Sequence, residues 1–268
     1  MANSKMKVGV IGAGVMGEAL IAALIKFGVA PASIQISEKR EERSDELVRK
    51  YGISSLDLIS NAKTSDVILL VVKPQDLSRV LGDLNEHIKP ETLLLSFVAG
   101  KKIGSIAGIL NGSQPIIRIM PNTPLLVGEG MSAISVGSGV TQEQKEFVVG
   151  FLEATGKVIE VDEVLQDAVT ATSGSGPAYF FAFVEAMIAG AEALGLSHSD
   201  ATTLTIQTIV GAAKLLNESG DTPTTLREKV TSPQGTTAAA LASFSSASLS
   251  EIVASAMKAA HTRSQELA

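Results

Sequence analysis

The chain has 268 residues, of which 45% are apolar and 19% charged, and its formal net charge is −6. This composition indicates a globular protein of one large or two smaller domains, and the acidic balance argues against general nucleic-acid binding. The chain contains no cysteine, which excludes disulfides and thiolate nucleophiles and is compatible with a cytoplasmic location. The three histidines, at 87, 198 and 261, are too scattered for a local metal motif, so no metal site is expected.

Up to about residue 162, short runs rich in β-branched residues alternate with helical patterns. Strands are predicted at residues 7–12, 33–37, 66–72, 92–98 and 115–120, and runs at 133–136 and 157–161 are expected to extend the sheet. Helices are predicted at 15–27 and 41–51. Because the strands are nearly continuous in apolar residues, we expect them to be parallel and covered on both faces. The alternation predicts an α/β fold with a Rossmann-type doubly wound sheet.

From residue 165 onward alanine-rich helical patterns replace the strands. We expect a first domain at 1–162 and an all-α second domain at 163–268, with helices near 165–172, 178–194, 199–218, 236–244 and 248–265. The apolar stretch 178–196 contains Glu185 and Glu192, so it is predicted to be a buried helix and not a membrane span.

The helix predicted at 178–194 carries small residues at a spacing of four and larger apolar residues on the opposite side: Ala178, Ala182, Ala186 and Gly190 against Phe183, Met187 and Leu194. A helix that is apolar on most faces must be covered almost completely. About a hundred residues of such helices would form a thin domain on their own. Pairing with a second copy of the chain is the simplest way to bury their apolar faces, and a helical bundle within one chain is the alternative.

The strongest local motif in the first half is "GAGVMG", with Gly12, Gly14 and Gly17. It follows a predicted strand and opens a helix, which is the context that dinucleotide binding requires. Gly12 permits the tight turn, Gly14 lets the backbone approach a pyrophosphate, and Gly17 allows close packing of helix on strand. The alternative is a plain tight turn between a strand and a helix.

The residues after the second strand bear on the type of dinucleotide. This strand ends at Ser37, and Glu38, Lys39 and Arg40 follow. A carboxylate at this position favours the free 2′-hydroxyl of NAD(H), whereas the two cations suit the 2′-phosphate of NADP(H). A solvated, charged helix start is the structural alternative.

Three further loops follow predicted strands, where a doubly wound sheet binds its ligands. "VVKPQ" at 71–75 contains Pro74, which stiffens the turn, and Lys73, which is expected to face the cofactor. "SFVAGKKI" at 96–103 contains Ala99 and Gly100, which are small enough to admit a flat ring. "MPNTP" at 120–124 brackets Asn122 with two prolines. Each loop taken singly is equally consistent with an ordinary rigid turn.

The second half contains "KVTSPQGTTAAALASF", which begins as a loop and ends as a helix expected to start at Thr236 and Thr237. No charged residue occurs from Val230 to Phe244. Free backbone N–H groups at a helix start are a site for a carboxylate without any arginine. The alternative is a proline-containing loop followed by a helix cap.

The segments "VKPQ", "MPNTP", "TSGSGPAYFF" and "VTSPQGTTAAAL" together resemble the pyrroline-5-carboxylate reductase family, and the likeness runs from Met6 to the C-terminus. The resemblance implies reduction of 1-pyrroline-5-carboxylate to L-proline, in the cytoplasm, with hydride from NAD(P)H. It favours NADPH, as do Lys39 and Arg40, whereas Glu38 opposes this and NADH is kept as the alternative. It also implies a helical domain that interlocks with that of a dimer partner.

The resemblance further implies site residues. The cyclic imine is expected at Ser232, Pro233, Gln234, Gly235, Thr236 and Thr237, with the Thr237 hydroxyl facing the ring nitrogen as the catalytic group. The expected cofactor contacts are Gly12, Gly14, Val15, Met16, Gly17, Ser37, Glu38, Lys39, Val72, Lys73, Pro74, Val98, Ala99, Gly100 and Asn122. One position departs from the family, which usually has glycine where this chain has Gln234. Its side chain must point away from the substrate or narrow the pocket.

Two rival functions are considered. A β-hydroxyacid dehydrogenase shares this layout. Such enzymes resemble one another in a glycine-rich helix start followed by a catalytic lysine. Here no lysine follows "SGSGP" until Lys214, which argues against this rival. A dinucleotide-sensing binding protein without turnover is the rival from another class, and the set of loops at one sheet edge argues against it.

Overall fold

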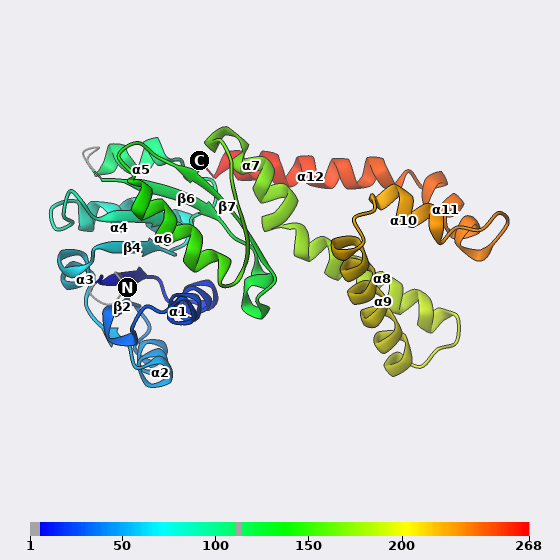
Figure 1. Cartoon of the computed structure of the whole chain (residues 1–268), viewed down its shortest axis with the longest axis horizontal. Coiled ribbons are helices and arrows are strands. Elements are labelled where there is room, and N and C mark those ends of the chain that lie inside the picture. Colours follow the sequence, from blue (N-terminus) through cyan, green and yellow to red (C-terminus); the bar gives the residue numbers. More distant parts are fainter. Residues whose placement is uncertain (1–5, 111–113, 268) are drawn as a thin grey trace. The chain divides into compact units, whose positions relative to one another are not determined.

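The computed structural model describes residues 6–110 and 114–267. Its sheet has eight strands in the order β3-β2-β1-β4-β5-β6-β7-β8 (Figure 1). Neighbouring strands are parallel except β6 and β7, which are antiparallel. The strands are β1 Val8–Ile11, β2 Ile34–Ser37, β3 Ser54–Ser55, β4 Val67–Leu70, β5 Leu93–Ser96, β6 Ile116–Met120, β7 Gly130–Val136 and β8 Gly156–Glu160.

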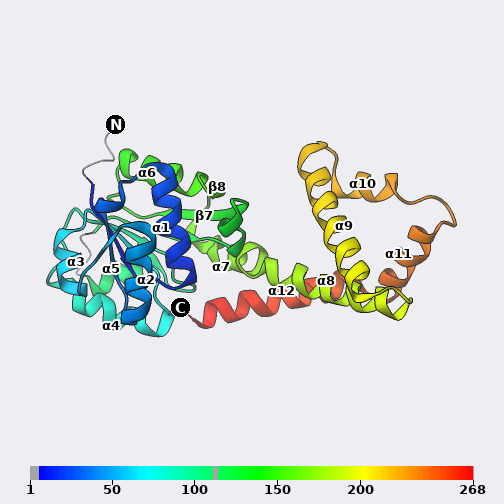
Figure 2. The same ribbon diagram turned by 90° about the horizontal axis from the view of Figure 1, so that it is seen from below.

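Helices cover both faces of this sheet (Figure 2). One face packs against α1 (Val15–Phe27), α2 (Glu41–Tyr51) and α6 (Gln142–Glu153). The other packs against α3 (Leu58–Thr64), α4 (Pro74–Asn85) and α5 (Ile103–Ile109). Successive strand residues alternate between the two cores, as the pleat requires.

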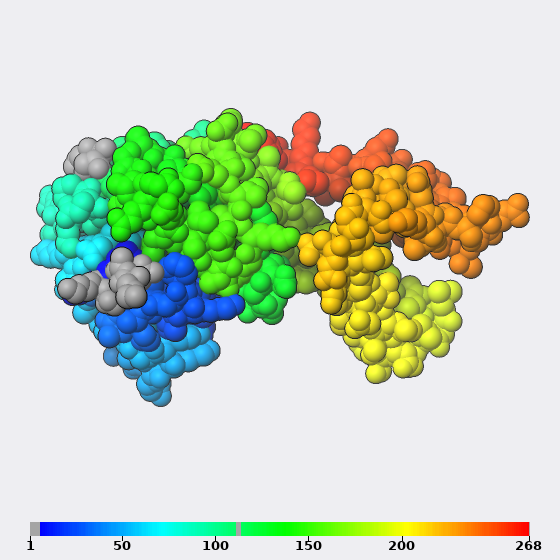
Figure 3. Space-filling model, in the orientation of Figure 1, coloured from blue at the N-terminus to red at the C-terminus, as the bar shows by residue number. Residues whose placement is uncertain are grey.

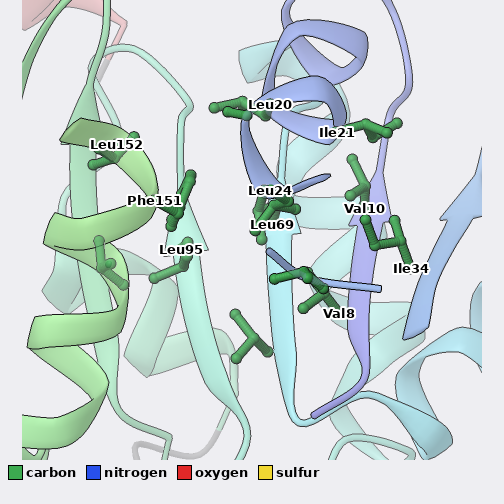
Figure 4. Close-up of a cluster of buried hydrophobic side chains, with 14 of the residues drawn as sticks. Val8, Val10, Leu20, Ile21, Leu24, Ile34, Leu69, Leu95, Phe151 and Leu152 are labelled. Atoms are coloured by element: carbon green, nitrogen blue, oxygen red, sulfur yellow. The ribbon is translucent and has the colours of Figure 1, made fainter. Parts of the chain in front are cut away.

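The first core brings together side chains from distant parts of the sequence. Figure 4 shows Val8 and Val10 of β1 beside Leu20 and Leu24 of α1, with Phe151 of α6 in the same cluster. Burying one large aliphatic side chain contributes roughly 1.5–3 kcal/mol. These contacts fix α1, and hence the glycine-rich turn before it, against the sheet.

The predicted fold class is confirmed, and all seven predicted strands and both predicted helices of the first half are present. The sequence did not indicate the short strand β3 or the reversal of β7. That reversal follows a 3-10 turn at Thr123–Val127, which starts with Pro124 in its first turn and ends at Gly128, whose φ is +81°. A further 3-10 turn occupies Pro31–Ser33.

The single helix predicted at 165–172 is wrong in its form. A 3-10 turn at Glu163–Leu165 leads into α7 (Gln166–Val169), and a π-helical turn follows at Thr170–Gly174. The Ser175 N–H donates to the carbonyl of Thr170 over 2.8 Å, five residues back. The Met120 side chain lies where a Cβ on Gly174 would be. The helical periodicity of the sequence cannot predict this contact between Gly174 and Met120, because Met120 lies in a strand far away in the sequence.

The chain forms two compact units, one of residues up to 175 together with those from 260, the other of residues 176–259. The second unit contains α8 (Gly176–Ala193), α9 (His198–Glu218), α10 (Pro223–Lys229), α11 (Thr236–Ser246) and most of α12 (Leu249–Glu266). Four of these helices were predicted, and α10 was not. The Ser197 hydroxyl caps α9 by accepting the Asp200 N–H over 3.1 Å, and Thr222 caps α10 in the same way.

The helices of the second unit bury little within one chain. α8 packs against α9, and the rings of Phe183 and Phe244 lie 6.2 Å apart. Phe180 and Phe181 are nevertheless 63% and 62% exposed, and Figure 3 shows the yellow surface of α9 open to view. Within residues 6–110 and 114–267, no single helix is long and apolar enough to cross a membrane; α11 and α12 meet this length and composition only as a pair, across a 52° bend.

Candidate active site

A candidate cofactor site lies at the carboxyl edge of the parallel strands. The strand order reverses between β1 and β4, since β2 lies on one side of β1 and β4 on the other. Open α/β sheets bind ligands at this switch point. The loops after β1, β2, β4, β5 and β6 all end at this edge and contain the cofactor contacts that the sequence predicts.

The turn after β1 has the geometry that a pyrophosphate needs. Gly12 has φ +91°, its N–H donates to the Ser37 carbonyl over 3.0 Å, and a Cβ here would lie 2.6 Å from the Val71 carbonyl oxygen. A Cβ on Gly14, by contrast, would meet no atom of the described chain within 4 Å. Gly17 packs directly on the Gly12 carbonyl, so α1 approaches β1 closely.

Gly14 is also the N-cap of α1, and no described side chain caps this helix start. The first-turn N–H groups and the open space at Gly14 together fit the phosphates of a dinucleotide. Val15, in the first turn, is 70% exposed, whereas Met16 packs against the core. Within this turn, Val15 therefore lies on the outer side and Met16 on the inner side.

The residues after β2, on which the predicted type of dinucleotide depends, form ion pairs. The Glu38 carboxylate accepts the Ala13 N–H over 3.1 Å and the Arg40 Nε–H over 3.0 Å. Lys39 lies 3.5 Å from Asp76 of α4. The Ser37 hydroxyl donates to the Leu56 carbonyl over 3.0 Å. Lys39 and Arg40 each face a carboxylate of the same chain.

The acidity of Glu38 results from opposing effects. Burial raises the pKa of this carboxyl, but hydrogen bonds from the Arg40 side chain and from the backbone N–H groups of Arg40 and Ala13 outweigh it and lower the pKa below its ordinary value. Glu38 is therefore ionised at neutral pH.

The loops after β4 and β5 differ in the exposure of their predicted cofactor contacts. Lys73 is the exposed N-cap of α4, and Pro74 occupies the first position of that helix. Val72 lies against the second core. Val98 is buried in the same core, so its side chain is occupied by packing.

One predicted reason, the room beside Gly100, needs correction, and the amide of Asn122 has partners within the chain. The space beside Gly100 is not open to a ring, because a Cβ there would lie 2.7 Å from the Leu267 side chain and 2.9 Å from the Ser264 carbonyl oxygen. The amide of Asn122 is already engaged: its Nδ2 donates to the Ser173 hydroxyl over 3.2 Å, and its Oδ1 accepts the Met131 N–H over 2.9 Å. Both residues stay predicted cofactor contacts, and the neighbouring Ala99 is partly exposed.

A second candidate site, described by itself, is the loop before α11; this loop belongs to the other unit. α11 begins at Thr236, as predicted, with Gly235 as its N-cap and no described side chain capping it. Gly235 donates its N–H to the Ser232 carbonyl over 3.1 Å. Ser232, Pro233, Gln234 and Thr236 are exposed, and Thr237 is partly buried.

Gln234 adopts φ +59°, in the left-handed region that favours glycine. This conformation gives a backbone reason for glycine at this position in the family. Gln234 keeps the same backbone at a cost in strain, and its exposed side chain adds a long polar group to the loop.

The sequence analysis missed a buried ionic cluster around Arg118. Arg118 of β6 is 3% exposed, and its guanidinium lies 3.5 Å from Glu163 and 3.6 Å from Asp167. Glu163 also accepts the Ile103 N–H over 2.6 Å, and Asp167 accepts the Ser264 hydroxyl over 2.7 Å. The signal was present: "PIIRIM" places one charge inside an otherwise apolar buried strand.

Within the described residues, no group of three His, Cys, Asp or Glu side chains is placed to hold a metal ion.

Two family models match parts of the chain. Residues 163–267 match the family model described as pyrroline-5-carboxylate reductase dimerisation, and residues 7–100 match that described as NADP oxidoreductase, coenzyme F420-dependent. A pyrroline-5-carboxylate reductase of Synechocystis sp. is 41% identical over 98% of this chain and 98% of its own.

Solved structures agree with these matches. A pyrroline-5-carboxylate reductase from Coxiella burnetii is 33% identical, with a TM-score of 0.90 over 99% of both chains. A pyrroline carboxylate reductase from Plasmodium falciparum, solved with NADP bound, is 28% identical, with a TM-score of 0.90 over 98% of both chains.

Proposed function

Because this chain belongs to the pyrroline-5-carboxylate reductase family, we propose that it reduces 1-pyrroline-5-carboxylate to L-proline with a hydride from NAD(P)H, the last step of proline biosynthesis. The observation that carries the proposal is similarity over almost the whole length, at 41% identity to the Synechocystis enzyme. Both rivals considered above explain this similarity less well, because neither requires the second half of the chain to match.

The cofactor site of this proposal is the edge of the sheet. The turn from Gly12 to Gly17 holds the pyrophosphate at the start of α1, where Gly14 leaves the space for it. Glu38 and Lys39 flank the adenosine ribose, and the backbone of Val72, Val98 and the loop after β6 lines the nicotinamide side. When bound, the reduced nicotinamide supplies the hydride. A relative solved with NADP bound supports the use of such a cofactor.

The substrate site of this proposal is the segment Ser232–Thr237. The substrate carboxylate binds the first N–H groups of α11, which carry no side-chain cap in the described chain. The Thr237 hydroxyl hydrogen-bonds the ring nitrogen and turns the imine carbon toward the nicotinamide. The protein contributes orientation, which lowers the barrier by removing the entropy cost of alignment.

The lack of charge from Val230 to Phe244 suits this chemistry. Hydride adds to the carbon of the C=N bond, and the ring nitrogen ends as an amine. If the imine arrives protonated, it carries that proton itself and needs no strong general acid from the protein. A lysine or arginine in the loop would repel the iminium.

The assembly proposed is a homo-oligomer built on a dimer of the helical domain. Ala178, Ala182, Ala186 and Gly190 are all exposed in the single chain, as are Phe180 and Phe181. An exposed apolar surface of this kind marks a protein contact, and the match to the dimerisation model supports it. We propose the functional domains as 1–162 and 163–268, and a cytoplasmic location, which subcellular fractionation tests.

Turnover tests the function directly. Oxidation of NADH and NADPH is followed with pyrroline-5-carboxylate, and reduction of NAD(P)⁺ is followed with a 3-hydroxyacid. The proposal expects turnover with the imine only. Turnover with the hydroxyacid alone would assign the first rival, and cofactor binding without any turnover would assign the second.

Thr237 is tested by two variants that separate shape from hydrogen bonding. Thr237→Ser keeps the hydroxyl, and Thr237→Val keeps the shape. A hydrogen bond to a charged group contributes about 1.5–3 kcal/mol. The Thr237→Val variant should therefore lower kcat by roughly one to two orders of magnitude, whereas the Thr237→Ser variant should stay active. Cofactor affinity should not change. A valine variant as fast as wild type, with normal KM, would leave Thr237 a structural role only.

A further inference from the structure

Glu38 occupies an unusual position at the carboxyl end of β2. Its side chain is 9% exposed, although it follows a strand and precedes a surface helix. One carboxylate oxygen accepts the Ala13 N–H of the glycine-rich turn over 3.1 Å. The carboxylate is thus fixed directly beside the turn that fits the pyrophosphate, about 20 residues after it, where dinucleotide-binding folds contact the adenosine ribose.

The cations near Glu38 are already paired. Arg40 donates its backbone N–H and its Nε–H to one oxygen of Glu38, over 3.1 and 3.0 Å. Lys39 faces Asp76 at 3.5 Å, and Arg43 pairs with Glu18 and Glu46. A 2′-phosphate entering here meets a fixed carboxylate and cations whose charge is largely compensated.

A ribose hydroxyl, by contrast, finds an acceptor. The longest hydrogen bond to Glu38 is that from Arg40 Nη2, at 3.4 Å. The Arg40 side chain is 65% exposed, so it can turn to solvent at low cost and leave this lone pair to a 2′-hydroxyl. A hydroxyl donating to a carboxylate is a charge-assisted hydrogen bond, stronger than one between neutral groups.

We propose that Glu38 sets the cofactor preference of this chain: its fixed carboxylate binds the 2′-hydroxyl of NADH and weakens the binding of the 2′-phosphate of NADPH. Removing the charge frees Arg40, which then pairs with the 2′-phosphate. The proposal rests on the proposed function, since it assumes that a reduced dinucleotide binds at this edge.

The test measures binding without turnover. The dissociation constants of NADH and NADPH are determined by isothermal titration calorimetry for the full-length wild type and for Glu38→Gln. Wild type should bind NADH more tightly. In the variant the ratio of the two constants should move toward NADPH by about tenfold or more, as expected for losing one charge-assisted contact and one repulsion. General damage to the turn would weaken both cofactors alike and leave the ratio unchanged.

Two further variants make the test specific. Glu42→Gln removes the same charge from an exposed site on α2 and should leave the ratio as in wild type. Glu38→Gln with Arg40→Ala should lose part of the gain in NADPH affinity. An unchanged ratio in Glu38→Gln, or an equal shift in Glu42→Gln, overturns the proposal. If wild type binds neither dinucleotide, the proposed function itself fails, which is a separate and recognisable outcome.

Discussion

Replacing Arg118 by methionine should destabilise the first unit, because it leaves two carboxylates without their cation. Arg118 is 3% exposed, with Glu163 at 3.5 Å and Asp167 at 3.6 Å. At an effective dielectric constant of about 20, each such contact corresponds to about 5 kcal/mol of Coulomb energy, most of which desolvation offsets.

The net cost follows from what remains after the substitution. Breaking a buried pair costs about 3–5 kcal/mol. The Glu163 side chain is 31% exposed and can turn to water, whereas that of Asp167 is 13% exposed and stays in the cluster. We therefore expect a loss of about 3 kcal/mol in the free energy of unfolding.

Urea unfolding followed by circular dichroism, at one fixed protein concentration, measures this loss. Hydrogen exchange at the Ile103 amide gives a local readout, since this N–H donates to Glu163. The triple variant Arg118→Met, Glu163→Gln, Asp167→Asn should recover most of the stability, because no unpaired charge is left. A single variant as stable as wild type refutes the reasoning, and a triple variant as unstable as the single one assigns the loss to packing instead.

Three other predictions follow from single sites. A hydrogen bond from Lys50 is the largest effect on Glu18; burial opposes it, and further hydrogen bonds from Arg43 and Tyr51 help to lower the pKa to about 2. The stabilisation is therefore complete above about pH 5 and is lost as the pH falls through 2, so Glu18→Gln should cost about 1–2 kcal/mol at pH 7 and little at pH 2, measured by urea unfolding. Gln234→Gly removes a side chain from a residue with φ +59° and so relieves about 1–2 kcal/mol of backbone strain, part of which the greater entropy of glycine in the unfolded chain offsets. The melting temperature should rise slightly, and KM for the imine should change. The control Ser248→Gly, at φ +55°, should change the melting temperature only. Ala186→Leu should overpack the proposed subunit contact by roughly 1–3 kcal/mol per site, and light scattering should show a smaller species or aggregation; an unchanged oligomer would place the contact elsewhere.

The sequence by itself determined the fold class and the main elements of this protein. Apolar runs such as Val67–Leu70 are predicted to be buried from their composition alone. The glycines at 12, 14 and 17 predict the turn after β1 because they lack a side chain. The start of α11 at Thr236 was also readable, because loop residues and helix formers meet there. Each of these is a local property, encoded within a few neighbouring residues.

Only the tertiary structure decided how residues far apart in the chain are paired. Arg118 meets Glu163 and Asp167 across more than forty residues, and Gly100 is small because Leu267 lies against it. Glu38 opposed NADPH on charge alone in the sequence, but its bonds to Ala13 and Arg40 are what fix that charge beside the turn. Such contacts depend on which elements the sheet order and the helix packing bring together, and no pattern of neighbouring residues contains that information.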